Sequence, residues 1–376
     1  MKASVTQQHL AHGLSIVSRA VSPRSTLPVL ANVLVATDEG RLRLSATNLE
    51  LGITCWIPAQ IQEEGSITVP ARTFVDLVGT FPPDKVALSL DTRTQTLDLE
   101  CNSSKHEIKG IDAQDFPPVP VPDLDEAVEL DLTSFKEMIS QVAFAASQDE
   151  ARPVLQGVKM EATENELTLA ATDGFRISVR KELLANPMRK NFSIIIPARA
   201  LTELARIAGD NDKTVSMVVP DGRGQVIFHL NEAELVSQLI DGNFPDYRAI
   251  LPKSYKTRTV VSTPGFLKAC KQAEIIAREG NNVVRLNILP DEENGIGKVE
   301  INSQTEETGK SDIQVEANIE GGAILIAFNV KFLREVLDVV RTPNVALETN
   351  TNNAPGVIKP VGDENYVHVI MPMHLG

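Results

Sequence analysis

The chain has 376 residues, 42% of them hydrophobic and 23% charged, which is the composition of an ordinary globular protein of two or three domains. No stretch approaches the roughly 18 consecutive apolar residues of a membrane span, and residues 1–20 lack a signal-peptide core, so we expect a cytoplasmic protein. The formal net charge of −14 argues against nucleic-acid binding unless basic residues gather on one surface.

The first third of the chain begins with a predicted amphipathic helix over residues 6–20, for which Thr6 is a suitable N-cap. Its apolar residues recur at i, i+4 and i+7 and therefore share one face: Leu10, Leu14 and Val17. A hairpin is predicted from Arg41 onward, because alternating apolar residues flank a polar turn. A short strand then leads into a second predicted helix over residues 71–80, and further alternating strands follow.

The second third repeats this order of elements. A helix is predicted over residues 133–147, with Thr133 or Ser134 as its N-cap, and a hairpin from Glu166. The apolar stripe of the helix has the same spacing: Phe135, Ile139 and Val142. A short strand again precedes a second helix, predicted over residues 198–208.

The last third shows the pattern once more. A helix is predicted over residues 264–279 with Thr263 as its N-cap, a hairpin from Lys298 and a second helix over residues 330–341. The corresponding apolar stripe is Phe266, Cys270 and Ala273. The chain ends in an apolar run that we interpret as a final core strand.

Corresponding residues of the three thirds lie at a nearly constant step. The offset from Leu10 to Phe135 is 125 residues, that from Phe135 to Phe266 is 131, and that from Pro70 to Pro197 is 127. A repeat of this kind indicates three copies of one supersecondary unit. Two helices and several hairpin strands in each copy predict an α+β fold, with the helices packed on antiparallel sheets.

The pattern breaks at the segments that begin at Phe116 and Asp241, and we place the domain boundaries near them. The predicted domains are residues 1–122, 123–251 and 252–376.

Five short motifs on this repeat resemble those of the bacterial DNA sliding clamps, the beta subunits of DNA polymerase III. The motifs are Arg24–Pro28, Val69–Arg72, Ala171–Arg176, Asp241–Tyr247 and Val369–Met373. The resemblance covers the whole chain and implies a head-to-tail homodimer whose six domains form a ring lined by helices. Helices spaced at about 8–10 Å would enclose a hole roughly 30–40 Å across, which admits duplex DNA. The function implied is that of a non-catalytic processivity factor without a cofactor.

The charges of the predicted helices fit such a ring. These segments hold 11 basic and 7 acidic side chains, a net charge of +4, which leaves −18 for the rest of the chain. A mildly basic hole inside an acidic exterior would attract phosphate at one place only, weakly and without regard to base sequence. Our candidates for contact with the DNA backbone are Arg72, Arg199, Arg206, Lys268, Lys271, Lys331 and Arg334. Ordinary solvated helix faces of mixed charge remain the alternative.

The resemblance also implies roles for other residues. Arg24 and Gln148 match loop positions that contact DNA, and Arg152 is a further candidate beside them. The seam between two chains would bring His106 and Ile108 against Ile275 and Ile276. A hydrophobic groove for short peptide motifs would include Thr172, Gly174, Phe175, Arg176, Ile177, Pro245, Ile250, Val369, Met371, Pro372 and Met373. The expected peptide partners are the replicative polymerase, the clamp loader, repair polymerases and mismatch-repair proteins.

Two alternatives belong to other classes of function. A peptide-binding scaffold that never encircles DNA would use the same groove. An enzyme would need catalytic groups, yet Asp173 has Asn48 and Gln304 at equivalent turns and is better explained as a turn former.

A metal site at His9 and His12 is conceivable, although solvation or phosphate contact is a simpler explanation of these two histidines. The cysteines lie far apart without metal-like spacing and are expected to be reduced: Cys55, Cys101 and Cys270.

Overall fold

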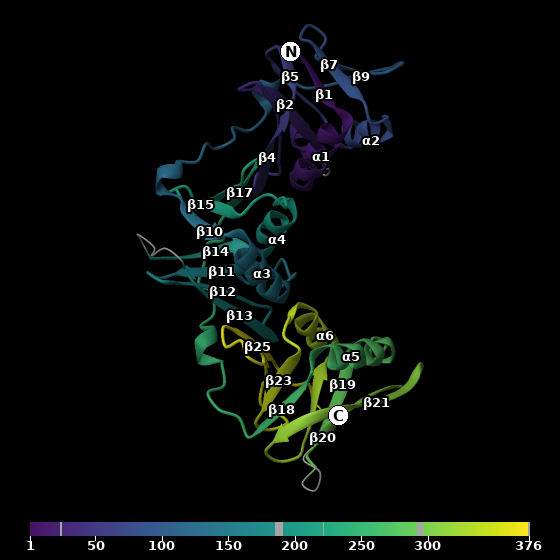
Figure 1. Ribbon diagram of the computed structural model, residues 1–376, viewed down its shortest axis with the longest axis vertical. Coiled ribbons are helices and arrows are strands. Elements are labelled where there is room, and N and C mark those ends of the chain that lie inside the picture. Colours follow the sequence, from purple (N-terminus) through teal and green to yellow (C-terminus); the bar gives the residue numbers. More distant parts are fainter. Residues whose placement is uncertain (23–24, 185–190, 221, 292–295, 375–376) are drawn as a thin grey trace. The chain divides into compact units, whose positions relative to one another are not determined.

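A computed structural model of the chain contains six α-helices within the residues it describes (Figure 1). The described residues are 1–22, 25–184, 191–220, 222–291 and 296–374. The helices are α1 (Gln7–Val17), α2 (Ala71–Thr80), α3 (Leu132–Val142), α4 (Ala198–Ile207), α5 (Thr263–Ala277) and α6 (Val330–Val339). Each falls on a predicted segment. Short 3-10 turns account for the longer predictions at α1 and α3: Ser18–Ala20 and Ala143–Ala145.

Two of the three predicted N-caps were wrong, because they lie inside the first turn of the helix. The cap of α5 is Ser262, whose hydroxyl accepts a backbone N–H of the first turn, so Thr263 is already helical. Ser262 has the extended dihedral angles that a cap requires. Helix α3 begins at Leu132, so Thr133 and Ser134 lie inside its first turn. The prediction for α1 is confirmed, because the Thr6 side chain accepts a backbone N–H of that helix.

Contacts divide the chain into two compact units. One consists of Met1–Thr133 and Arg199–Leu239, and the other of Ser134–Ala198 and Ile240–Gly376. For brevity we call them the first and the second unit. The middle third of the chain contributes to both.

The first unit contains two antiparallel sheets. The five-stranded sheet has the order β5 (Gln60–Glu63), β1 (Lys2–Thr6), β7 (Lys85–Asp91), β8 (Thr96–Cys101) and β9 (Ser104–Lys109). The eight-stranded sheet has the order β10 (Val128–Asp131), β15 (Thr214–Val218), β16 (Gln225–His229), β17 (Ala233–Gln238), β4 (Leu51–Pro58), β3 (Arg41–Thr47), β2 (Asn32–Asp38) and β6 (Ser66–Pro70). Helix α1 packs on β4 through its predicted stripe, and Gly13 permits this approach, since a Cβ there would lie 2.9 Å from Leu44.

The second unit contains one antiparallel sheet of twelve strands. Their order is β14 (Phe192–Pro197), β11 (Gly157–Ala162), β12 (Glu166–Thr172), β13 (Arg176–Leu183), β25 (Tyr366–Ile370), β24 (Gly356–Pro360), β23 (Asn344–Thr349), β18 (Thr257–Ser262), β21 (Gly309–Glu320), β20 (Gly297–Thr305), β19 (Val283–Leu289) and β22 (Ile324–Asn329). Helices α5 and α6 pack together on β19–β21 and β22, where Phe266, Cys270 and Leu333 are buried. The α+β fold with helices on antiparallel sheets is confirmed.

All three predicted hairpins are present, as β3–β4, β12–β13 and β20–β21. The first two are each extended by a strand from far along the chain. Strand β17 pairs with β4, and strand β25 pairs with β13, both antiparallel. The two hairpin tips therefore have comparable surroundings in their separate units.

Candidate functional site

Side-chain hydrogen bonds hold the turn between β12 and β13. Asp173 accepts the backbone N–H groups of Phe175 and Arg176 at 2.9 and 3.1 Å. The Thr172 hydroxyl donates to the Arg176 carbonyl at 2.7 Å, and Gly174 adopts a φ of +93°, which glycine reaches without strain. Asp173 is thus a turn former, as the sequence indicated. The turn leaves Phe175 60% exposed at its tip.

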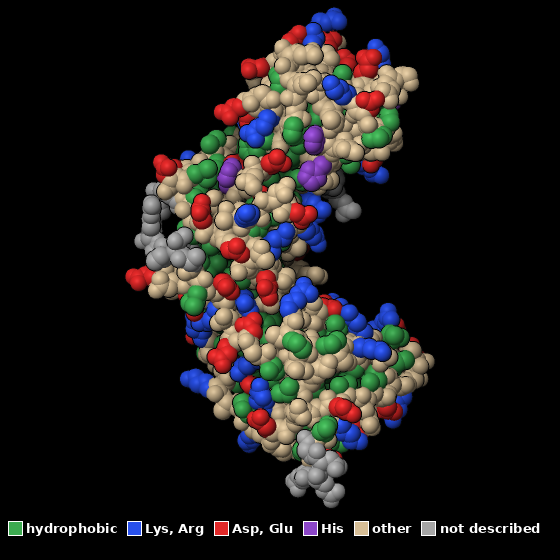
Figure 2. All heavy atoms as spheres, in the orientation of Figure 1, with side chains coloured by type: hydrophobic (Ala, Val, Ile, Leu, Met, Phe, Trp, Pro, Cys, Tyr) green, Lys and Arg blue, Asp and Glu red, His purple; other side chains and the backbone are tan. Residues whose placement is uncertain are grey.

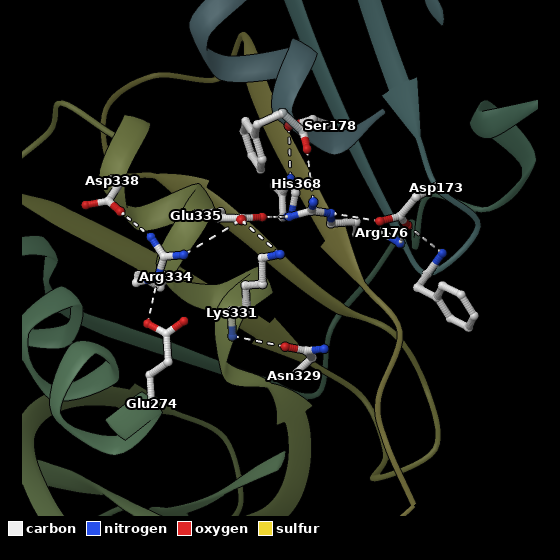
Figure 3. A network of polar contacts seen from close by, with 12 residues as sticks. Asp173, Arg176, Ser178, Glu274, Asn329, Lys331, Arg334, Glu335, Asp338 and His368 are labelled. Carbon is white, nitrogen blue, oxygen red and sulfur yellow. Dashed lines mark hydrogen bonds and ion pairs between the residues drawn. The ribbon is translucent and has the colours of Figure 1, made fainter. Parts of the chain in front are cut away.

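The Arg176 side chain, in contrast, is buried (Figure 3). It pairs with Asp173 at 3.0 Å and with Glu335 of α6, and it donates to the backbone carbonyl of Phe144 at 2.9 Å. Its guanidinium carbon lies 4.3 Å from the ring centroid of Phe332 and 5.2 Å from that of Phe144. Two carboxylates, a carbonyl and two aromatic faces compensate the desolvation of the buried charge.

Glu335 connects this arginine with the charged surface of α5 and α6 (Figure 3). Lys331 and Arg334 approach the Glu335 carboxylate at 3.9 and 3.7 Å. Arg334 also pairs with Glu274 of α5 at 2.7 Å and with Asp338 at 3.2 Å. A continuous series of ion pairs therefore runs from the hairpin turn to the helix surface.

A buried hydrogen-bonded group lies beside Arg176 and joins β13 to β25. The hydroxyls of Ser178 and Tyr366 lie 2.7 and 2.9 Å from the Gln141 carbonyl, and both donate to it. The Ser178 oxygen is then free to accept from Nδ1 of His368 at 2.9 Å. Burial lowers the pKa of His368 well below its usual range, and the positive charge of Arg176 lowers it further. His368 is therefore neutral.

The residues after β25 are held by backbone hydrogen bonds on two sides. The Met371 N–H donates to the Phe175 carbonyl at 2.8 Å, and the Met373 N–H donates to the Ala327 carbonyl of β22 at 2.8 Å. The predicted final core strand is present as β25, but it ends at Ile370, so Met371 lies beyond it and is exposed. The segment that follows it is ordered by the strands on which it lies.

Three exposed apolar side chains lie on the segments that meet near the turn. They are Phe175, Ile250 and Met371, which are 60, 44 and 40% exposed. Beneath the turn, Ile177 and Val369 pack with Tyr247 in a small apolar cluster. The 3-10 turn that carries Tyr247 ends immediately before Ile250, so the same cluster anchors that segment.

The eleven predicted groove residues all lie in the second unit but differ in exposure. The exposed ones are Gly174, Phe175, Pro245, Ile250 and Met371. The half-buried ones are Pro372 and Met373. The buried ones are Thr172, Arg176, Ile177 and Val369. A ligand can reach the first two sets, whereas the buried residues shape the backbone beneath them.

Most of the predicted phosphate-contacting side chains are paired with nearby carboxylates. The pairs are Arg72 with Asp76 at 3.8 Å, Arg206 with Glu203 at 3.0 Å, Lys271 with Asp338 at 2.8 Å and Lys331 with Glu335 at 3.9 Å. Arg199 donates to the Arg19 carbonyl at 3.1 Å, and Lys268 has no ion pair with any described residue. Surface ion pairs contribute about 0–1 kcal/mol, so a phosphate can displace the carboxylates at little cost.

The helices are less basic than their predicted ranges implied. The six α-helices hold 8 basic and 6 acidic side chains, a net charge of +2 rather than +4. The difference arises because Arg19, Arg278, Glu279 and Arg341 lie just beyond the helix ends. Figure 2 shows the same mixture, with basic and acidic side chains interspersed over the visible face.

Of the loop residues predicted to contact DNA, one is exposed and another is paired with the protein itself. Arg24 lies outside the described residues, and Gln148 is exposed. Arg152 pairs with Asp149 at 2.9 Å and donates to the Asp173 carbonyl at 3.1 Å. Arg152 therefore also supports the turn beside the groove residues, a contact that the sequence did not indicate.

The residues predicted for the seam are partly accessible. Ile275 is 56% exposed and Ile276 half-buried, whereas Ile108 is only 5% exposed within its own unit. His106 is half-buried, and its ring centroid lies 5.6 Å from that of Phe81. Strand β9, which carries His106 and Ile108, is the last strand of its sheet, and no strand of the described residues pairs with its outer edge. Such an edge offers unpaired backbone groups to another strand.

The cysteines and His9, the other candidate reactive or metal-binding groups, are part of the packing or the helix start where they lie. The three cysteines are free and buried, and burial raises the pKa of the Cys55 thiol to about 12. Nδ1 of His9 lies 2.9 Å from the Thr6 hydroxyl at the start of α1. No group of three or more metal-ligating side chains is found among the described residues. No helix in the described part of the chain is long and apolar enough to cross a membrane.

Comparison with known proteins gives one consistent family. Residues 1–120, 129–246 and 248–374 match the N-terminal, central and C-terminal domains of the DNA polymerase III beta subunit. The chain is 33% identical to the beta sliding clamp of Synechococcus elongatus over the whole of both chains, and 32% identical to that of Staphylococcus aureus over 99% of each. The Bacillus subtilis DNA polymerase sliding clamp has a similar structure, with a TM-score of 0.93 at 30% identity and complete coverage of both chains. The beta subunit of Pseudomonas aeruginosa gives a TM-score of 0.88 at 26% identity, again over both whole chains.

Proposed function

The chain belongs to the family of bacterial DNA polymerase III beta subunits, the DNA sliding clamps, and from that premise we propose how its parts serve a ring on duplex DNA. It is a DNA polymerase processivity factor. In our proposal two chains join head to tail, and the domains 1–122, 123–251 and 252–376 of each form a six-domain ring in the cytoplasm. One observation carries the proposal: a unit of two helices and hairpin strands recurs along a chain that matches sliding clamps from end to end.

Such a ring acts by topology. A closed ring cannot leave the duplex sideways, so each contact with phosphate can be weak, and weak contacts permit sliding. Helix arginines and lysines that are already paired with carboxylates suit this role, because they attract phosphate without holding it tightly. We assign the chain no catalytic residue, metal or cofactor, and a separate ATP-driven loader would open the ring.

Retention on circular DNA tests this mechanism directly. After loading onto nicked circular plasmid at moderately high salt, the protein is expected to stay bound through gel filtration. Linearisation of the same plasmid should release it, because a ring can slide off free ends. Equal loss from circular and linear DNA would show that the protein does not encircle its template. A peptide-binding scaffold that never meets DNA would then be the better explanation.

Charge reversal on the helices tests the weak attraction to phosphate. The double variant Arg72→Glu, Arg199→Glu is expected to load less efficiently and to lower the slope of log loading against log salt by about two. Both side chains are exposed and lie at the starts of α2 and α4. The matched control Lys85→Glu, Lys253→Glu changes the net charge equally outside the helices. Unchanged loading of the first variant, or equal loss in both, would count against a DNA-facing role for these helices.

The groove is proposed to bind short peptide motifs of several DNA-processing proteins. The expected partners are the replicative polymerase, the clamp loader, repair polymerases and mismatch-repair proteins. Exposed Phe175, Ile250 and Met371 would provide apolar contacts, and methionine adapts well to different partners. The network around Arg176 supports this surface from below, since it fixes the turn that carries Phe175.

Two further elements complete the proposed ring. Arg24, Gln148 and Arg152 would contact DNA where it leaves the hole. The outer edge of β9 would pair with a strand of the partner chain, with Ile275 covered by that contact. Two separate observations support this assignment: β9 has an unpaired outer edge in the first unit, and Ile275 is exposed on the second unit.

A further inference from the structure

The first unit contains a turn, at residues 47–51, that repeats the hydrogen bonds of the groove turn. Asn48 accepts the backbone N–H groups of Glu50 and Leu51 at 3.0 and 2.7 Å, as Asp173 does for the two residues that follow Gly174. The Gln238 N–H donates to the Glu50 carbonyl at 2.8 Å, and this bond repeats the one from Met371 to Phe175. In this correspondence Glu50 replaces Phe175, and Gln238 replaces Met371.

A cavity of about 160 Å³ lies at this equivalent turn. Ala46, Gly52 and Val236 of the sheet line it, and the segment Pro117–Pro120 forms another wall. That segment follows Phe116 as Pro245 follows Phe244 beside the groove turn. A cavity of about 150 Å³ accommodates a benzene molecule, so this one has room for a single aliphatic side chain.

The rim of the cavity differs chemically from the groove. It carries the polar residues Glu50, Gln225 and Gln238 beside the exposed Leu49. Glu50 is exposed, and its carboxylate has no ion pair or hydrogen bond with any described side chain. A ligand seated on the apolar wall can therefore meet an unpaired negative charge beside two amide groups. Charge complementarity selects a cation at this position.

The backbone of the turn gives a second indication. Leu49 lines the cavity, is 50% exposed and adopts a φ of +78°. The groove turn has Gly174 at the equivalent place, where a positive φ is free of strain. A leucine in this conformation is strained, and strained residues concentrate at binding and switch sites.

We propose that this cavity is a second peptide site, which binds an extended segment of a partner protein containing an aliphatic residue followed by arginine. The aliphatic side chain enters the space between Val236 and Pro117–Pro120, and the guanidinium pairs with Glu50. Gln225 and Gln238 are placed to bond the peptide backbone. The site does not depend on ring closure, and its acidic rim disfavours the apolar motifs expected at the groove.

The dipeptide N-acetyl-leucyl-arginine amide is a suitable probe, and its binding to the full-length protein can be followed by saturation-transfer NMR. Binding in the millimolar range is expected, weakened about fivefold by Glu50→Gln, since an exposed ion pair contributes little more than that factor. N-acetyl-leucyl-glutamate amide should give no transfer. Met371→Ala, which alters the groove alone, should leave binding unchanged.

Comparison of probe binding between the wild type and the variants distinguishes the cavity from the groove. Equal affinity of the wild type and Glu50→Gln, or no binding of the probe to the wild type, would overturn the proposal. Loss of binding in Met371→Ala with retention in Glu50→Gln would show that the probe occupies the groove. A second variant, Val236→Phe, fills the cavity and is expected to abolish binding, and its thermal unfolding curve establishes whether it is folded. Retention on circular DNA is measured separately, so failure here leaves the ring mechanism untouched.

Discussion

Replacing Arg176 with alanine is expected to lower the free energy of unfolding of the second unit by about 3–5 kcal/mol. The guanidinium is buried between Asp173 and Glu335 and rests on the ring of Phe332. Its removal leaves the Asp173 carboxylate without its cation, leaves Glu335 with only the more distant Lys331 and Arg334, and opens space beside Phe144. Both changes destabilise the folded state. Urea unfolding followed by circular dichroism measures the loss.

Arg206→Ala is the matched control for this experiment. Arg206 also pairs with a glutamate, at 3.0 Å, but its side chain is 55% exposed, so its removal is expected to change stability by less than about 1 kcal/mol. A similarly small loss for Arg176→Ala would mean that the buried network adds nothing to the fold. The conservative variant Arg176→Lys should recover only part of the stability, because an ammonium group cannot match the planar contacts of a guanidinium.

Removing the apolar side chains at the groove turn is expected to weaken partner-peptide binding about 100-fold. Phe175→Ala and Met371→Ala together delete two exposed apolar side chains, each with the character of an interface hot spot worth about 1–2 kcal/mol. Fluorescence anisotropy with a labelled peptide carrying the clamp-binding motif of the polymerase from the same genome provides the dissociation constant. The ring should still be retained on circular DNA, since neither residue lies on a helix.

The structure favours these substitutions over a deletion of the C-terminus. Removing the chain from Met371 onward would also delete the backbone hydrogen bonds to Phe175 and Ala327, and would uncover the edge of β22. Val121→Ala together with Leu124→Ala is the control, because it removes two exposed aliphatic side chains from the first unit. An unchanged dissociation constant in the Phe175 and Met371 variant would exclude these residues from the peptide site.

Local periodicity was sufficient to predict the elements of this fold. The helix stripe of Leu10, Leu14 and Val17 is almost completely buried, and the alternating segments from Arg41 and Glu166 form hairpins. These predictions succeed because side-chain spacing of 3.6 or 2 residues decides which face of an element is apolar. The errors at the caps are equally local: at α5 the adjacent Ser262 and Thr263 both suit one capping position, and α3 begins at Leu132, before the serine and threonine that were predicted to cap it.

The buried polar network could not be predicted in the same way. Arg176 and Glu335 are 159 residues apart in the chain, and Ser178 is separated from His368 by 190. From its sequence position Glu335 is one of several acidic residues on the predicted helices, and Arg176 is a groove residue implied by the family resemblance. Nothing near either position in the sequence specifies the partner. The pairing of β25 with β13 brings Ser178 to His368, and Glu335 reaches Arg176 from α6.

The sequence alone therefore determined the repeated unit, the type of each main element and the family to which the chain belongs, because all three depend on residue spacing and short motifs. Tertiary structure decided which predicted groove residues are exposed, which helix cations are paired with acids, and that a polar counterpart of the groove turn adjoins a cavity at Glu50. Burial and ion pairing depend on distances in space between residues far apart in the chain. Local spacing carries no information about those distances, so these properties emerge only when distant strands pair.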